Sequence, residues 1–174
     1  PGNAEVRARL GEIYLEQKQY SDAIRELEAV RSAGRADVTV NDALLHAYLE
    51  AKQNDKAMAL LPDLLAAKPD NSELYLLRGS LLMEKRQFPD AAVSFRRASE
   101  LAPNSPEVFT NLASALYLMK DYQGTVAALE KVGALGKDTA GSYFLRAISL
   151  EKLELKQPAL ENYQKFLALD GKKN

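Results

Sequence analysis

The sequence repeats itself every 34 residues, and this period constrains the fold more than any other feature of the chain. Five copies follow one another without insertion or deletion, at residues 4–37, 38–71, 72–105, 106–139 and 140–173. Glycine, alanine or leucine holds the eighth place of each copy, and alanine or threonine holds the twentieth. A period of this length is typical of an array of stacked units, in which each unit leaves an apolar side that its neighbour covers.

The copy at 72–105 shows most clearly what each unit is. Tyr75, Gly79 and Leu82 recur at spacings of three to four residues, which places them along one side of an α-helix. Ala91 and Phe95 have the same spacing in a second apolar stretch of the copy. We therefore predict a helical hairpin, in which the small residue at place eight lets the two helix axes approach while Phe95 fills the space beside it.

These residue types, in this order, resemble the tetratricopeptide repeat, a helix–turn–helix unit with a small residue, an aromatic, an alanine, a phenylalanine and a closing proline. The resemblance covers 170 of the 174 residues, since the phase holds through all five copies. It implies an all-α fold, a right-handed α-solenoid of helix–turn–helix repeats that forms a single array over residues 1–174. It also implies a non-enzymatic scaffold for protein–protein interaction, and an ungapped array of this kind is expected to be bacterial.

The copies differ at the place of the closing proline. Pro69 and Pro103 close copies two and three, because the proline ring cannot continue a helix. Arg35, Lys137 and Gly171 stand at this place in the other copies. We therefore expect the turns that end copies one, four and five to differ from the other two.

Copy four is the most weakly specified helix pair. Gly124 and Gly133 fall inside its second helix, and Thr125 replaces the alanine of place twenty. Glycine lowers helix propensity, so we expect the softest joint of the array at this copy.

Composition narrows the class of partner. The formal net charge of −1 and the pI near 6.0 argue against binding to nucleic acid, which needs clustered lysine and arginine. No apolar run approaches the roughly 18 residues of a membrane span, so we expect no membrane insertion. The absence of cysteine excludes disulfides and thiol chemistry, but it leaves the compartment open between cytoplasm and periplasm.

The sequence favours neither an enzyme nor a cofactor site. His46 is the only histidine, so motifs that need two histidines are impossible. The stretch at 133–139 resembles a phosphate-binding loop, but Lys131 stands where the first glycine belongs, and Asp138 replaces the required serine or threonine. A metal site formed by His46 with Glu50 is the remaining alternative of this class.

The family resemblance also implies where a partner would bind. In such arrays the first helix of each copy lines a concave groove, and the second, fifth, sixth, ninth, twelfth and thirteenth places of each copy face it. Carried over place by place, the candidate groove residues are Asp42, His46, Glu50, Leu76, Leu77, Glu84, Asn111, Tyr117, Leu118, Phe144, Leu145 and Ile148.

The candidate groove changes character along the chain. Glu16, Glu50 and Glu84 occupy the same place in three successive copies and form an acidic row, whereas the later copies contribute mainly apolar residues. The expected partner is a protein that offers a peptide or helix with basic residues at one end and apolar anchors at the other. In the alternative interpretation, the glutamates form a solvated face and the apolar residues pack against neighbouring helices.

The last helix, expected over residues 159–169, has an apolar side with no further copy to cover it. Its candidate contact residues are Leu160, Phe166, Leu167 and Leu169. Terminal repeats normally need a polar outer face. Two interpretations stay open: the native chain continues past this helix, or the apolar side mates with a second subunit. The second interpretation defines an alternative function, a structural assembly module that forms homo-oligomers through its C-terminal repeat.

Overall fold

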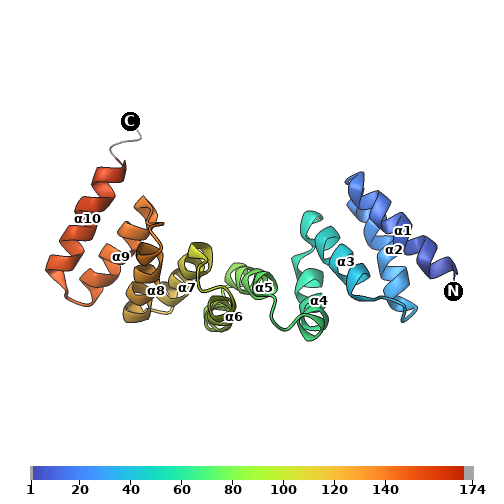
Figure 1. Ribbon diagram of the computed structural model, residues 1–174, viewed down its shortest axis with the longest axis horizontal. Helices are drawn as coiled ribbons and strands as arrows, with labels where there is room; N and C mark the ends of the chain where they lie inside the picture. The colour runs from blue at the N-terminus through green and yellow to red at the C-terminus, as the bar shows by residue number, and fades with distance from the viewer. Residues whose placement is uncertain (1, 171–174) are drawn as a thin grey trace. The chain divides into compact units, whose positions relative to one another are not determined.

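The computed structural model describes residues 2–170, which form ten α-helices and no strand within that range (Figure 1). Their bounds are α1 (Gly2–Glu16), α2 (Tyr20–Ser32), α3 (Val38–Glu50), α4 (Asn54–Ala67), α5 (Ser72–Glu84), α6 (Phe88–Leu101), α7 (Pro106–Leu118), α8 (Tyr122–Ala134), α9 (Ala140–Lys152) and α10 (Lys156–Asp170). Each copy of the repeat contains one pair of helices, so the all-α class and the hairpin unit are confirmed.

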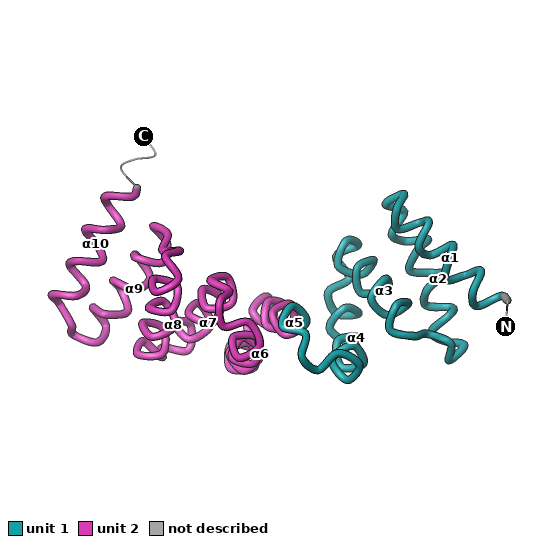
Figure 2. Tube along the Cα trace, in the orientation of Figure 1, with its two compact units in different colours: residues 1–74 teal, residues 75–174 magenta. Residues whose placement is uncertain are grey.

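The helices form two compact units, residues 1–74 and residues 75–174 (Figure 2). In the first unit, α1 packs against α2 and α3, and α3 packs against α2 and α4. In the second unit, the contacts run from α6 to α7, from α7 to α8, from α8 to α9 and from α9 to α10. The single array over 1–174 stays a prediction.

The core of each unit lies on the second helices, at places twenty, twenty-four and twenty-seven of the repeat. Side chains at these places in α2, α4, α6 and α8 are at most 2% exposed. They are Ala23, Leu27, Val30, Ala57, Leu61, Leu64, Ala91, Phe95, Ala98, Thr125, Leu129 and Val132. The one polar member, Thr125, donates its hydroxyl hydrogen to the carbonyl oxygen of Asp121, so its burial leaves no unpaired donor.

The turn inside each hairpin has the same unusual backbone in all five copies. The residue at place fifteen adopts a positive φ between 56° and 64°, although it is never glycine: it is Lys18, Lys52, Arg86, Lys120 or Glu154. The N–H group that follows bonds back to a carbonyl five residues earlier, as Gln53 does to Tyr48 at 2.8 Å. This pattern is the Schellman motif, which usually places glycine in the left-handed region.

The second helices of copies one to four have two kinds of C-terminus. In α2 and α8, Gly34 and Gly136 adopt φ of +67° and +66°, and the next N–H completes a Schellman motif. In α4 and α6, the last helical turn is followed by Lys68 or Ala102, whose ψ of 67° is not helical, and then by Pro69 or Pro103. The expected difference is therefore confirmed for copies one and four, while Gly171 lies outside the described residues.

Gly124 of copy four takes part in the N-terminal cap of α8. The carboxylate of Asp121 accepts a hydrogen bond from the backbone N–H of Gly124 at 2.9 Å and caps α8. A β-carbon at Gly124 would lie 2.5 Å from that carboxylate. The caps of α2, α4 and α6 make no such side-chain bond, because a glutamine stands at this place. This cap offsets part of the low helix propensity of α8, and the softness of copy four stays a prediction.

Candidate partner-binding surfaces

None of the twelve candidate groove residues lies in the core, because each side chain is exposed or half-buried. Those on α3 belong to the first unit, and those on α5, α7 and α9 belong to the second. The assignment of these side chains to a binding groove stays a prediction. The contacts of the acidic and of the apolar candidates differ.

The acidic residues of the candidate groove on α3 already have partners within the chain. The carboxylate of Asp42 pairs with the ammonium group of Lys68 at 2.5 Å. The carboxylate of Glu50 accepts a hydrogen bond from the Tyr20 hydroxyl, and this bond is the main cause that raises the pKa of Tyr20. These contacts favour the interpretation of this side of α3 as a solvated, internally paired surface.

His46 lies on the same helix with its Nε2 4.0 Å from Oε1 of Glu50, and both side chains are exposed. Among residues 2–170, no group of three or more histidine and carboxylate side chains is arranged to hold a metal ion. This pair therefore lacks the further ligands that a stable divalent-metal site requires.

None of the described helices combines the length and the apolar character that crossing a membrane requires.

The aromatic side chains of α9 and α10 form one cluster. The ring of Phe144 lies 5.3 Å from that of Phe166 and 6.2 Å from that of Tyr163. The Tyr163 hydroxyl donates a hydrogen bond to Glu151 at 2.7 Å, and this bond is the first cause that raises the pKa of Tyr163. Since Phe144 is a groove candidate and Phe166 a self-association candidate, the two predicted surfaces meet at this pair.

The apolar groove candidates of α7 and α9 lie at the surface of the second unit. Leu118 is 47% exposed and Phe144 is 43% exposed, while the Tyr117 ring packs edge-on against Tyr122 at 5.9 Å. We name this surface the apolar groove patch, which consists of Tyr117, Leu118, Phe144, Leu145 and Ile148.

The outer side of α10 is apolar, as expected. Leu160, Leu167 and Leu169 are exposed, with Leu167 the most exposed of them at 64%. Phe166 is half-buried against Phe144. We name the surface formed by Leu160 and Leu167 the α10 face.

The structure adds an apolar surface at the first helix that sequence reasoning missed. Val6, Leu10 and Ile13 lie along one side of α1 and are 58%, 38% and 47% exposed. The sequence signal was the place in the repeat, because places three, seven and ten are apolar in copies two and four as well. We name this surface the α1 stripe.

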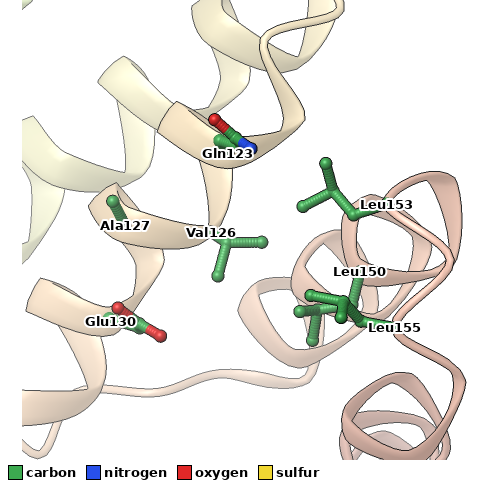
Figure 3. A pocket seen from close by; sticks show the side chains of 7 residues that line it. All are labelled: Gln123, Val126, Ala127, Glu130, Leu150, Leu153 and Leu155. Carbon is green, nitrogen blue, oxygen red and sulfur yellow. The ribbon is translucent and has the colours of Figure 1, made fainter.

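A pocket of about 380 Å³ lies between α8 and the turn that joins α9 to α10. Figure 3 shows Val126 of α8 facing Leu150, Leu153 and Leu155, with Gln123 and Glu130 at the α8 side. Sequence reasoning missed this pocket. The available signal was Leu155, which stands at a place that is glutamine or aspartate in the other four copies.

Two family models, both described as tetratricopeptide repeat, match this chain. One matches residues 1–44, and the other matches residues 43–106 and 76–139. These matches span most of the chain and agree with the helix pairs of the structure. The chain belongs to the tetratricopeptide repeat family.

Curated relatives include a BBSome complex member BBS4 homolog from Drosophila melanogaster, 26% identical over 155 residues. They also include the formate-dependent nitrite reductase complex subunit NrfG from Escherichia coli O157:H7, 24% identical over 130 residues. These alignments cover 88% and 73% of this chain, but only 32% of the first relative and 66% of the second.

Solved structures of MamA have a similar fold. MamA AMB-1 gives a TM-score of 0.84 at 23% identity, covering 97% of this chain and 92% of that one. A MamA RS-1 double mutant gives a TM-score of 0.82 at 14% identity. The alignment covers 100% of this chain and 98% of the mutant chain. At these sequence identities the similarity shows the fold, a tetratricopeptide α-solenoid. It does not identify a binding partner for this chain.

Proposed function

We propose that this chain is a non-enzymatic scaffold that binds a peptide or helix of a partner protein on its apolar groove patch. The family supports the general class, since a tetratricopeptide fold is a scaffold for protein–protein interaction. Two relatives are named as members of multi-protein complexes, the BBSome and the nitrite reductase complex. The exposed apolar side chains of the apolar groove patch support the location of the proposed binding site.

The observation that carries the proposal is the exposure of Leu118 and Phe144 on neighbouring repeats of the second unit. The ring of Phe144 packs against the rings of Tyr163 and Phe166 on α10, and these contacts restrict its motion before a partner binds. A rigid aromatic side chain loses little conformational entropy on binding, and such side chains dominate the energetics of interfaces.

The chemistry of the patch favours apolar anchors in the partner. Leu145 and Ile148 are half-buried and continue the surface along α9. Basic residues at one end of the partner were expected from the acidic row, but Asp42 and Glu50 are engaged by Lys68 and Tyr20. An amphipathic helix or extended peptide with aliphatic or aromatic anchors therefore fits best.

The test uses a library of random peptides selected for binding to the full chain. Selected peptides should be rich in apolar residues, and they should lose binding to the Leu118→Glu and Phe144→Glu variants. Val93→Glu is the matched control, because Val93 is 63% exposed on α6, outside the patch. Peptides that bind the two patch variants as tightly as the unmodified chain would show that the patch is not the site.

Self-association through the C-terminal repeat is the second candidate function. It is favoured by the α10 face, whose leucines project into solvent where a solvated helix would have polar residues. Sedimentation of the full chain should then show a mass that rises with concentration, and Leu160→Lys with Leu167→Lys should abolish that rise. A chain that stays monomeric at every concentration contradicts this candidate.

A further inference from the structure

We propose that the pocket between α8 and the α9–α10 turn is a second partner site, which takes a peptide that presents a lysine or arginine beside a large apolar side chain. We name it the α8 pocket, and its lining residues are Gln123, Val126, Ala127, Glu130, Leu150, Leu153 and Leu155. It shares no residue with the apolar groove patch. This inference therefore goes beyond the proposed function and does not depend on it.

The α8 pocket has apolar walls on both sides. Val126 of α8 faces the three leucines of the following repeat, in a pocket of about 380 Å³ (Figure 3). Leu155 is 47% exposed, and it stands at place sixteen, where the other four copies have glutamine or aspartate. The leucine adds apolar surface to the rim, so an apolar side chain of a partner that enters the pocket loses its contact with water.

The pocket also contains one charged side chain. Among its lining residues, all of which belong to the described part of the chain, only Glu130 is ionisable. Within residues 2–170, the Glu130 carboxylate forms no hydrogen bond and no ion pair with another side chain. A cation that pairs with it would also be covered by the apolar walls, and the exclusion of water strengthens such a pair.

The equivalent carboxylate between copies one and two shows which groups complement this position. Glutamate stands at place twenty-five only in copies one and four, as Glu28 and Glu130. The Glu28 carboxylate accepts one hydrogen bond from the hydroxyl of Tyr48 and another from the ammonium group of Lys56, both at 2.8 Å. The same ammonium group lies 5.5 Å from the centroid of the Tyr48 ring. Within this chain, a glutamate at place twenty-five is thus engaged by a cation beside an aromatic ring.

Copy five lacks both of these groups. Place eleven is Leu150 instead of tyrosine, and place nineteen is Pro158 instead of lysine. Neither side chain can donate a hydrogen bond to Glu130. In copy two, the tyrosine and the lysine both belong to the repeat that follows the glutamate, so no third repeat is needed to engage it. The free carboxylate of the α8 pocket therefore results from two residue differences between adjoining repeats.

The ligand class follows from this comparison. An ammonium or guanidinium group of the partner would take the position that Lys56 holds at Glu28, while an apolar side chain beside it would cover the leucines. Gln123 and Glu130, at the α8 side of the pocket, are seven residues apart, which is about 10 Å along a helix axis. An extended peptide covers this distance with about three residues. The basic and the apolar residue of the partner thus belong to one short segment.

The test uses a library of random short peptides, selected for binding to the full chain that carries Leu118→Glu. This change places a charge in the apolar groove patch, so the selection is depleted of peptides that need that patch. The affinity of each selected peptide is then measured by fluorescence anisotropy for the unmodified chain and for Glu130→Gln and Val126→Glu. Glu161→Gln is the matched control, because Glu161 is an exposed glutamate of α10 outside the pocket.

A further variant closes the pocket with groups of the chain itself. Leu150→Tyr with Pro158→Lys gives copy five the two residue types that engage Glu28 in copy two. These groups should occupy the Glu130 carboxylate and compete with the peptide. Thermal melting followed by circular dichroism establishes that this double variant is folded before its affinity is measured.

The selected peptides are expected to contain lysine or arginine within about three residues of a leucine, phenylalanine or tyrosine. Their affinity should fall about tenfold or more in Glu130→Gln, because a hydrogen bond to a charged group is lost. It should fall in Val126→Glu and in the closed variant as well, and it should not change in Glu161→Gln.

Two results would overturn this inference and leave the groove proposal standing, since Leu118→Glu tests that proposal separately. The first is a selection that yields no binding peptide. The second is a set of peptides that bind Glu130→Gln as tightly as the unmodified chain. Peptides that need Val126 but contain no basic residue would likewise refute the cation as part of the ligand.

Discussion

A β-carbon built on Gly79 would lie 2.3 Å from Cε1 of Phe95, closer than two packed carbon atoms can come. The phenyl ring therefore occupies the space that a side chain at place eight would fill. Copy one has the same arrangement, since a β-carbon on Gly11 would lie 2.6 Å from Cγ of Leu27. The small residue and the large residue are thus one packing unit that sets the distance between the two helices of a hairpin.

We predict that Gly79→Ala lowers the free energy of unfolding by about 1–3 kcal/mol, because the methyl group overpacks the ring. This loss should exceed the gain of up to about 1 kcal/mol that alanine brings to a helix interior. Urea denaturation followed by circular dichroism measures the free energy of unfolding of this variant and of a second one. The second variant, Gly79→Ala with Phe95→Leu, should recover part of the loss, because copy four packs Ala113 and Leu129 at these places. A single variant more stable than the unmodified chain would contradict the overpacking.

The positive φ of Lys120 gives a prediction of the opposite sign. The left-handed region costs a residue with a β-carbon about 1 kcal/mol, and glycine is free of this cost. Lys120→Gly should therefore raise the free energy of unfolding by about that amount. The reverse change, Gly136→Ala, places a β-carbon at φ +66° and should lower it similarly. Equal denaturation midpoints for the two variants would show that these turns carry no such strain.

Both side chains of the Arg146–Asp138 ion pair are largely buried, since they are only 12% and 14% exposed. Arg146 also donates to the carbonyl oxygen of Leu129 in α8, so it ties α9 to the preceding helix. Arg146→Ala should cost about 3 kcal/mol, because it leaves a buried carboxylate without its counter-charge.

The control for this prediction is Arg9→Ala, which removes an exposed ion pair with Glu12. We expect no measurable change in melting temperature for that variant. A further double variant, Arg146→Leu with Asp138→Ala, removes both charges and places the leucine that copies one, two and four have at this place. It should recover most of the stability, and failure to do so would indicate that the ion pair is itself the stabilising element.

Tyr48 makes the stability dependent on alkaline pH. Burial, and then its hydrogen bond to Glu28, raise the pKa of this phenol above its ordinary value. The neutral phenol is therefore favoured in the folded state, and its contribution is fully present below the unfolded-state pKa of about 10. The contribution is lost as the pH rises above that value toward the folded-state pKa.

The test compares Tyr48→Phe with the unmodified chain in urea denaturation at neutral pH and above about pH 10. The variant should be less stable at neutral pH, because Glu28 loses one of its two donors, Tyr48 and Lys56. Its stability should also fall less steeply as the solution becomes alkaline. Tyr14→Phe is the matched control, because it removes the same hydroxyl at the same place of copy one. Identical slopes for Tyr48→Phe and the unmodified chain would refute the linkage.

Much of the fold could be predicted from the sequence because the period fixes which residues share a helix face. Gly79 and Phe95 were expected to pack together, and they do. Pro103 was expected to close α6, and the helix ends at Leu101. The turns of place fifteen could not be predicted in this way, because lysine, arginine and glutamate give no local signal for the left-handed region. The conformation belongs to the Schellman turn that ends each first helix, in which the next N–H bonds back to a carbonyl five residues earlier.

The sequence by itself determined the hairpin unit, its five copies and the apolar faces of its helices. Only the tertiary structure decided what each face meets. It engages Glu50 with the hydroxyl of Tyr20, so part of the acidic row already has a partner within the chain. It seats Phe144 against Phe166, and so joins two surfaces that the sequence had kept apart. It also leaves Ile13 exposed at a place that is buried in later copies. The physical reason is that periodicity assigns a residue to a side of a helix, while burial and pairing depend on the neighbour that packs against that side.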